Sequence, residues 1–438
     1  MQLSASHRLE SFRRLLIHAH AALDLKFGFV LWNGSTVPVG LEPDALTIHI
    51  ADEGVVAALL RRPSIDTVAN LWSAARLDIR GGTLFDLAAS RPSVRSRVLL
   101  RALDRRLVFR TLAPFLFVSR GGPFPLERMR GDGERVDGSE EANRDNVGYH
   151  YDVSNAFYSL FLDPAMVYSC AYFTDWSNDL AKAQADKLEM ICRKLRLRAN
   201  EKFLDIGCGW GALICHAAKY HGVRAHGVTL SREQFAYAAD RVEREGLKGR
   251  ATLELRDYAF TEGTFDKIAS IGMFEHVGAA NHEIYFRTVN RLLRPGGLYL
   301  HHAIHRPAKR DRRRFERPSR EYAALVRYIF PGGELDHLGM SVDNLQRHGF
   351  EVHDVEGWRE HYARTCRLWH DRLFARHQEA ESEAGTVRTR LWLAYLAGCS
   401  MAFERNTVGI YQTLASKRVR GASGLPPTRA DLYLEARN

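Results

Sequence analysis

The stretch LDIGCGWG (204–211) carries the strongest fold signal in this chain of 438 residues. It follows an apolar run typical of a strand and precedes a helical pattern, which places Gly207, Gly209 and Gly211 in the turn between them. Glycines let a backbone approach a ligand where any Cβ would clash. The spacing G-x-G-x-G differs from the dinucleotide fingerprint G-x-G-x-x-G, and no acidic residue ends the next strand about 20 residues on. The pattern therefore predicts a ligand turn of another kind, with a ligand-free glycine turn as the alternative.

Strand-like runs alternate with longer stretches on both sides of this turn. They are FLDIG (203–207), VRAHGVTL (223–230), ATLELRDY (251–258), FDKIASIG (265–272) and LYLHHAIH (298–305). The stretches between the first four, and the one before the last, are long enough for crossover helices, so a doubly wound parallel sheet is expected. Residues 320–400 read as mainly helical, an insertion expected to form a lid, before a last strand-like run at 407–417.

The N-terminal part reads as a small α/β module. A helical pattern comes first, followed by strand-like runs at 27–32 and 45–50 and a helix through 55–60. Residues 119–145 combine glycine, proline and charge with almost no periodicity, which is typical of a linker. The expected organisation is an N-terminal domain over 1–118, a linker over 119–145 and a second domain over 146–438.

Composition restricts the class of protein. Hydrophobic residues make up 45% and charged residues 26% of the chain, which excludes a membrane-embedded or largely disordered protein. The net charge of +10 implies an anionic partner, either nucleic acid or an anionic membrane surface. The six cysteines form no C-x-x-C pair, and no signal peptide or run of about 18 apolar residues is present. These features predict a reduced, cytoplasmic protein.

The glycine turn resembles that of S-adenosylmethionine-dependent methyltransferases of the Rossmann-like class. Many of these enzymes hold the ribose with an acidic residue at the end of the second strand, whereas this chain has GVTLSREQ (227–234). The hydrogen bonds would then come from Thr229, Ser231 and Gln234. The residues that the resemblance assigns to the S-adenosylmethionine site are Tyr168, Ser169, Asp205, Gly207, Gly209, Thr229, Ser231, Gln234, Asp257 and Tyr258.

Seven separated motifs together resemble the cyclopropane-fatty-acyl-phospholipid synthase family. They are GYHYDVSNAFYSLFLDPAMVYSCAYF (148–173), LDIGCGWG, GVTLSREQ, GMFEHVG (272–278), LHHAIH (300–305), YIFPGGEL (328–335) and WREHYARTCRLWH (358–370). The resemblance implies a class I methyltransferase domain with a helical lid insertion. Residues 27–90 are similar, more loosely, to the small sterol-carrier-like α/β domain that precedes it in many members.

The family's reaction explains which residue types are needed. The sulfonium methyl goes to a cis double bond of a phospholipid acyl chain, and the resulting cation loses a proton as the ring closes. The site therefore needs a base beside the cation and a dry pocket. The resemblance implies that a bound bicarbonate is that base. It would be held by the loop and backbone at Cys170, the side chains of Glu275 and His302, the backbone of Ile304 and the hydroxyl of Tyr362. Strand alternation places His301 on the face opposite His302.

Two basic segments are candidates for contact with an anionic surface. Residues 306–320 contain eight basic residues against Asp311 and Glu316, a local charge of +6. Residues 97–110 place Arg97, Arg101 and Arg105 at helical spacing. Each segment is either solvated or docks on anionic lipid. For residues 306–320 nucleic acid is disfavoured, because no aromatic residue beyond Phe315 interleaves the charges.

The sequence as a whole predicts an enzyme at the inner face of the membrane. It would be peripherally associated, and its partner would be a phospholipid bilayer with unsaturated acyl chains and an anionic surface. The alternatives are a C-methyltransferase that gives methyl-branched or methylene acyl chains, and a lipid-binding protein with an inactive methyltransferase domain. A homodimer is left open.

Overall fold

The computed structural model describes residues 4–91, 102–128, 154–317, 319, 322–323, 327–329 and 333–433. Contacts divide the chain into two compact units. The first comprises Met1–Gly131, Arg320–Ala324 and Gly385–Ala397, and the second comprises Asp132–Ser319, Leu325–Ala384 and Gly398–Asn438. The second unit therefore begins close to the expected boundary, but two short segments of the expected C-terminal domain belong to the first unit.

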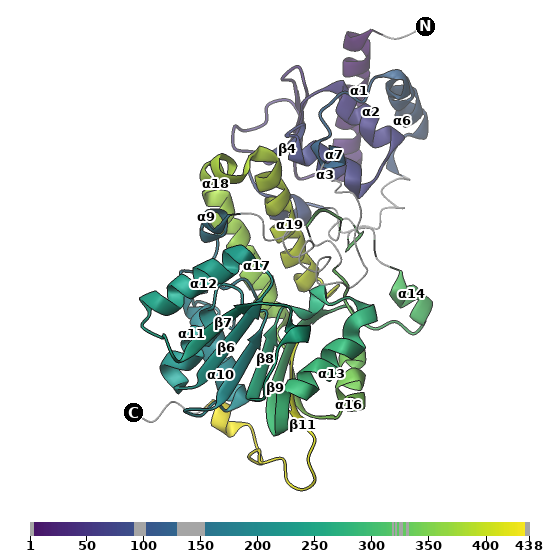
Figure 1. The fold of residues 1–438 in the computed structure, drawn as a ribbon. Helices are drawn as coiled ribbons and strands as arrows, with labels where there is room; N and C mark the ends of the chain where they lie inside the picture. Colours follow the sequence, from purple (N-terminus) through teal and green to yellow (C-terminus); the bar gives the residue numbers. More distant parts are fainter. Residues whose placement is uncertain are drawn as a thin grey trace. The chain divides into compact units, whose positions relative to one another are not determined.

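The second unit is built on a seven-stranded sheet in the order β10-β11-β9-β8-β5-β6-β7 (Figure 1). Its strands are β5 Lys202–Ile206, β6 Arg224–Thr229, β7 Ala251–Leu255, β8 Phe265–Ile271, β9 Leu293–His305, β10 Phe350–Gly357 and β11 Gly409–Lys417. β5 to β9 pair in parallel, as expected, whereas β11 runs antiparallel to both β9 and β10. The sheet is thus of the Rossmann-like class with one reversed strand.

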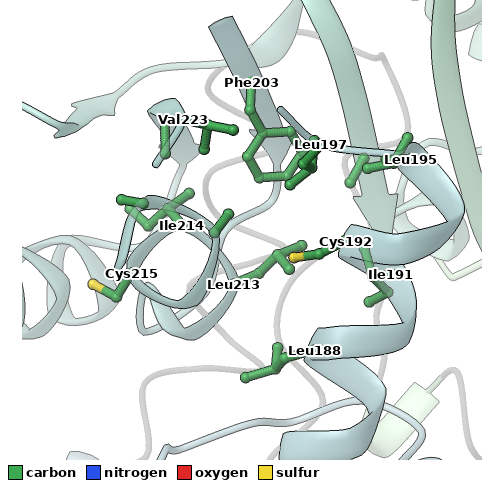
Figure 2. Close-up of a cluster of buried hydrophobic side chains, with 14 of the residues drawn as sticks. Leu188, Ile191, Cys192, Leu195, Leu197, Phe203, Leu213, Ile214, Cys215 and Val223 are labelled. Carbon is green, nitrogen blue, oxygen red and sulfur yellow. The ribbon is translucent and has the colours of Figure 1, made fainter. Parts of the chain in front are cut away.

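Strand alternation divides the buried side chains of this sheet between two faces. Phe203 of β5 packs with helices α10 Leu180–Leu195 and α11 Ala212–His221, a cluster shown in Figure 2. The next residue, Leu204, belongs to the cluster on the other face, with α13 His282–Leu292 and α16 Leu338–Arg347. Helix α12 Arg232–Arg244 joins the α10 side through Val242. Both faces of the sheet are therefore covered, as a parallel sheet requires.

The expected helical insertion over 320–400 is interrupted by a strand, so this prediction was too broad. β10 pairs with β11 along its whole length at the edge of the sheet. Its sequence FEVHDVEG buries only Phe350 fully, and such a polar edge strand gives little period-2 signal. The continuous helical part is α17 Arg359–Ala375, α18 His377–Ala384 and α19 Thr386–Glu404.

The first unit is a small α/β fold around a four-stranded sheet in the order β2-β1-β3-β4. Its elements are α1 Ala5–Leu23, β1 Gly28–Val30, β2 Thr36–Val37, β3 Thr47–Ile50, α2 Glu53–Arg61, α3 Ile65–Ser73, β4 Leu77–Arg80, α4 Leu84–Ala89, α6 Arg105–Leu112 and α7 Pro125–Arg128. Phe12, Val55 and Phe115 lie in its core. The likeness to a sterol-carrier domain stays a prediction.

The expected linker over 119–145 is corrected at its start. Residues 119–128 are part of the first unit, because Leu126 is fully buried and its backbone N–H donates to Asn70 Oδ1 at 2.9 Å. The rest of the expected linker lies outside the described residues, as do Arg97 and Arg101 of the basic segment 97–110.

Candidate active site

The glycine turn follows β5 and opens α11, as its sequence predicts. Gly207, Gly209 and Gly211 all have positive φ angles, of 79°, 54° and 81°, which L side chains rarely adopt. A Cβ built on Gly207 would lie 2.8 Å from Met273 Cγ. A Cβ built on Gly209 would meet no heavy atom of the described chain within 4 Å. The turn therefore leaves open space directly over its middle glycine.

A pocket lies over this turn, at the carboxyl ends of the parallel strands, where ligands bind in open α/β sheets. Nine of the ten residues predicted for the cofactor line it: Tyr168, Ser169, Asp205, Gly207, Gly209, Thr229, Gln234, Asp257 and Tyr258. Three neighbouring strands, β5, β6 and β7, and the segment before α10 bring them together, although they are spread over 91 positions of the sequence. The fold thus brings together nine of the ten residues that the motifs predicted for the cofactor site.

The tenth predicted residue, Ser231, is not among the residues that line the pocket, but it forms hydrogen bonds with two residues that are. Its hydroxyl caps α12 by accepting the backbone N–H of Gln234 at 3.3 Å, and its own N–H donates to Thr229 Oγ1 at 3.2 Å. Thr229 Oγ1 in turn donates to Gln234 Oε1 at 3.0 Å. Ser231 therefore orients the two residues that occupy the place of the usual strand-end acid.

A buried lysine that motif analysis missed also lines the pocket. Lys187 of α10 donates from Nζ to Ser169 Oγ at 2.9 Å, and burial lowers its pKa to about 8. Beside it, burial raises the pKa of Asp205 to about 7, and Asp205 Oδ1 has no hydrogen-bond partner within the described structure. The sequence did contain an indication that Lys187 is buried, because it lies four residues from both Ala183 and Ile191 on the apolar face of α10.

Glu275 lies next to this pocket, in a 3-10 turn (Phe274–His276) directly after β8. Its Oε1 accepts the backbone N–H of Ile304 at 2.7 Å. Its Oε2 is buried and finds no partner among the described residues, and burial raises the pKa of the carboxyl group to about 7. The backbone N–H of Ile304, which was expected to help hold bicarbonate, thus donates to the Glu275 carboxylate in this structure.

His302 of β9 is fully buried on the α10 side of the sheet, whereas His301 lies on the opposite side against Phe274. The Nδ1 of His302 accepts from Gln412 Nε2 at 2.8 Å. Its Nε2 is buried and unpartnered in the described part of the chain. Burial and the nearby cations Lys187 and Lys194 hold the pKa of His302 well below its usual range, so the imidazole is neutral.

Cys170 and Tyr362 complete the predicted set. Cys170 Sγ contacts the carbonyl oxygens of Ala171 at 3.2 Å and Trp358 at 3.8 Å, and burial raises its pKa well above that of an ordinary thiol. It is therefore no nucleophile. Tyr362 of α17 packs its ring 4.7 Å from that of Phe403. Burial raises the pKa of its hydroxyl, and the neighbouring Cys366, Cys170 and Glu275 raise it further.

The two groups of residues adjoin in sequence and in space. Ser169 lines the pocket and Cys170 follows it, while Met273 and His276, which lie on either side of Glu275 in the sequence, also line the pocket. Two buried side-chain atoms of the predicted set, Glu275 Oε2 and His302 Nε2, have no hydrogen-bond partner within the described structure. Such an arrangement suits a small group that both donates and accepts hydrogen bonds.

Comparison with known proteins identifies this combination of fold and site. The family model described as "Mycolic acid cyclopropane synthetase" matches residues 139–413. The chain belongs to the cyclopropane synthase family. The family's members act on lipid acyl chains with S-adenosylmethionine, so this chain is an S-adenosylmethionine-dependent methyltransferase of that group.

Three relatives illustrate the range of this family. A probable fatty acid methyltransferase of Pseudomonas putida is 36% identical over 94% of this chain and 97% of its own length. The cyclopropane-fatty-acyl-phospholipid synthase of Escherichia coli K12 is 37% identical over 62% of this chain and 67% of its own. The crystal structure of mycolic acid cyclopropane synthase CmaA1, complexed with SAH and CTAB, is 32% identical, with a TM-score of 0.59 over 63% of this chain and 98% of that one.

Proposed function

We propose that this cyclopropane synthase homologue transfers the methyl group of S-adenosylmethionine to the cis double bond of unsaturated acyl chains in membrane phospholipids and closes a cyclopropane ring. The observation that carries the proposal is that Glu275 Oε2 and His302 Nε2 are both buried and without a partner in the described structure, and that Glu275 lies in the sequence between Met273 and His276, which line the cofactor pocket. A carbocation on an acyl chain needs a hydrogen-bond acceptor nearby and no water, and this region offers both.

The pair fits a bound bicarbonate ion. Bicarbonate has one O–H donor, which suits the acceptor Glu275 Oε2, and further oxygens that accept, which suits a protonated His302 Nε2. When bound there, it would supply a proton acceptor. The Ile304 N–H fixes the Glu275 carboxylate, Gln412 fixes the imidazole, and the Cys170 loop and Tyr362 exclude water from the same region.

Contact with an anionic membrane surface is the second part of the proposal. In the segment 306–320, Asp311 caps the short helix α14 Arg312–Glu316. Phe315 anchors this helix: it is buried and packs under the Arg306 guanidinium at 4.3 Å. Arg312 and Arg314 point outward with side chains 91% and 80% exposed. The basic side chains are therefore displayed on a fixed turn, as a docking surface requires.

The first unit has a surface of similar character. Phe109, Leu116 and Phe117 are exposed large apolar residues on or next to α6, which also carries Arg105 and Arg110. Exposed apolar side chains beside arginines are typical of surfaces that lie in a membrane interface. Among the described helices, none is long and apolar enough to cross a bilayer.

A C-methyltransferase on the same acyl chains is the second candidate. The name of the Pseudomonas putida relative, a probable fatty acid methyltransferase, favours it, because that relative matches nearly the whole chain. Both reactions can pass through the same cation, and the branched product follows if a chain carbon loses the proton, or if a hydride shift and a reduction by a separate reductant follow.

An assay with purified protein tests the proposal. S-adenosylmethionine is supplied with vesicles of a monounsaturated phospholipid, with the corresponding free fatty acid, or with a saturated phospholipid. The proposal expects product only from the unsaturated phospholipid, heavier by one CH₂ group and unchanged by catalytic hydrogenation. Product from the free acid alone would contradict the phospholipid substrate, and a product that takes up hydrogen would contradict ring closure.

A further inference from the structure

We infer that Lys194 and Gln412 hold His302 in the tautomer that carries its proton on Nε2, which makes His302 a fixed hydrogen-bond donor to the reaction site and prevents it from acting as the base. This inference rests on the proposed function for its catalytic meaning. Its geometry, however, can be tested without turnover.

A chain of hydrogen bonds runs from the surface of the sheet to the imidazole. Glu356 of β10 is paired with Lys194 Nζ, and Lys194 Nζ donates to Gln412 Oε1 at 2.8 Å. The Gln412 amide then reaches His302 Nδ1 at 2.8 Å. β11 places Gln412 directly opposite His302 on β9, so the register of the sheet fixes this contact.

The donor and the acceptor in each of these hydrogen bonds follow from which groups carry a proton to donate. A lysine ammonium only donates, so it must face the carbonyl oxygen of the Gln412 amide rather than the NH₂ group. The NH₂ group is then turned toward His302 and donates to Nδ1, which must therefore be without a proton. Since the buried imidazole is neutral, its single proton is on Nε2, the atom that lacks a partner in the described structure.

The consequence concerns the reaction. A protonated Nε2 can stabilise an anion or a ligand oxygen beside the cofactor pocket, but it has no lone pair for the proton that the substrate loses. That proton must go elsewhere, and in the proposed reaction it goes to the bicarbonate whose O–H would be accepted by Glu275 Oε2, a buried atom without a partner in the described structure. Lys194 and Gln412 are thus positioning residues, because they act only through His302.

Nitrogen-15 NMR of the full chain labelled on its histidines tests this directly. Long-range correlations distinguish protonated from unprotonated ring nitrogens, and the His302→Asn variant assigns the signals. We expect His302 with Nε2 protonated and Nδ1 unprotonated. In Gln412→Glu, the new carboxylate can only accept from Nδ1, so the proton should move to Nδ1 and turnover should fall by about 10²-fold, the scale of one lost donor at a reacting centre. Affinity for S-adenosylmethionine should stay unchanged.

The controls separate this role from a general structural one. Lys194→Met should give a mixture of the two His302 tautomers, because the Gln412 amide can then turn over. Lys267→Met removes another buried lysine of the same sheet, which faces Glu201, and should leave the tautomer and turnover unchanged. Wild-type His302 protonated on Nδ1, or Gln412→Glu with an unchanged tautomer and rate, would overturn the inference. An Nε2–H tautomer in a protein that modifies no lipid would instead refute the proposed function alone.

A different observation supports a second proposal, a zinc site between α10 and α11. Cys192, His216 and His221 each have a ligand atom within 4.8 Å of the other two. Glu189 adds a carboxylate oxygen 3.1 Å from His216 Nε2 and 3.0 Å from His221 Nε2. We propose that these four side chains bind one Zn²⁺ ion, because a thiolate, two imidazoles and a carboxylate are the ligands that zinc takes in tetrahedral sites.

The helices explain the juxtaposition. Glu189 and Cys192 are three residues apart on α10 and share one of its faces, and α11 packs against that face. Figure 2 shows Cys192 pointing toward the α11 residue Leu213, whereas Cys215 points away on the far side of that helix. Binding would release the thiol proton of Cys192 and would tie α10, which carries Lys187 and Lys194, to α11, which follows the glycine turn.

Metal analysis of the purified full chain tests this proposal. We expect one zinc per chain, and after chelation and cobalt loading an absorption band from thiolate-to-cobalt charge transfer. Cys192→Ala should abolish that band, and His216→Gln or His221→Gln should weaken zinc binding at least tenfold. Cys215→Ala, a cysteine of the same apolar cluster, is the matched control and should change neither. A chain without zinc that does not compete with a chromophoric chelator, or a band insensitive to Cys192→Ala, would overturn the site.

Discussion

The carboxylate of Glu275 accepts the backbone N–H of Ile304 at 2.7 Å, which ties the turn after β8 to the neighbouring strand β9. β9 also carries His302, whose imidazole is held from β11. Two neighbouring strands and a turn therefore fix both polar groups of the candidate site, and neither depends on a long loop. A site held in this way keeps the Glu275 carboxylate and the His302 imidazole in fixed positions, as catalysis by positioned groups requires.

Replacing Glu275 by Gln tests its part in proton removal. The variant keeps the shape and an oxygen for the Ile304 N–H but loses the charge, so turnover should fall by about 10²-fold or more. Calorimetry should show an unchanged affinity for S-adenosylmethionine. Glu283→Gln, which removes an exposed carboxylate of α13, should behave as wild type. Full activity in Glu275→Gln would remove this residue from the mechanism.

The same residue predicts a pH dependence of stability. The pKa of Glu275 rises from 4.5 to about 7 on folding because the carboxyl group is buried. The folded chain then binds this proton more tightly than the unfolded chain, so the contribution of Glu275 to stability falls as the pH rises from about 4.5 to about 7. The total loss is about 3 kcal/mol. Urea unfolding at pH 5 and pH 8 should show Glu275→Gln gaining stability relative to wild type at the higher pH, and equal differences at both would contradict the burial of a charged group there.

Replacing Gly209 by Val should abolish S-adenosylmethionine binding. The side chain would enter the open space over the turn, and its backbone has a φ of 54° that valine adopts only with strain. Gly249→Val controls for the strain, since Gly249 also has a positive φ and an open surrounding but lies outside the pocket. If the two variants bind the cofactor equally well, calorimetry would exclude the assigned pocket.

The sequence predicted the parts of the site that follow strands. Glycine turns, strand ends and the GMFEHVG string are local, so their positions follow once the sheet is predicted. The roles of Lys187 and Gln412 were not predicted, because they depend on which face of α10 or β11 meets the site. The packing of segments that are distant in the sequence determines this face. Strand β10 was not predicted, because an edge strand buries few side chains and shows no strong alternation of apolar and polar residues.

The outward-facing arginines of α14 should matter only for anionic membranes. Replacing Arg312, Arg313 and Arg314 by Gln should weaken co-sedimentation with vesicles that contain anionic lipid, and should flatten its salt dependence, because such attraction is screened over a Debye length of about 8 Å at physiological salt. Binding to neutral vesicles and cofactor affinity should not change.

A control variant with the same change in net charge is available. Arg244, Arg287 and Arg347 are exposed arginines in helix ion pairs elsewhere in the second unit. Replacing these three by Gln should have a smaller effect on binding to anionic vesicles. Equal losses in both triple variants would show that total charge, rather than the segment 306–320, governs binding.

The most direct test of the account counts deuterium in the product formed from S-adenosylmethionine that carries a CD₃ group. If the proton is taken from the new methyl group beside Glu275 and the ring closes, mass spectrometry of the phospholipid acyl chains will find a CD₂ group, with two deuterium atoms, in a product that hydrogenation leaves unchanged. A product that retains all three deuterium atoms would show that a chain carbon loses the proton, or that the cation is reduced, and would contradict ring closure as the reaction of this enzyme.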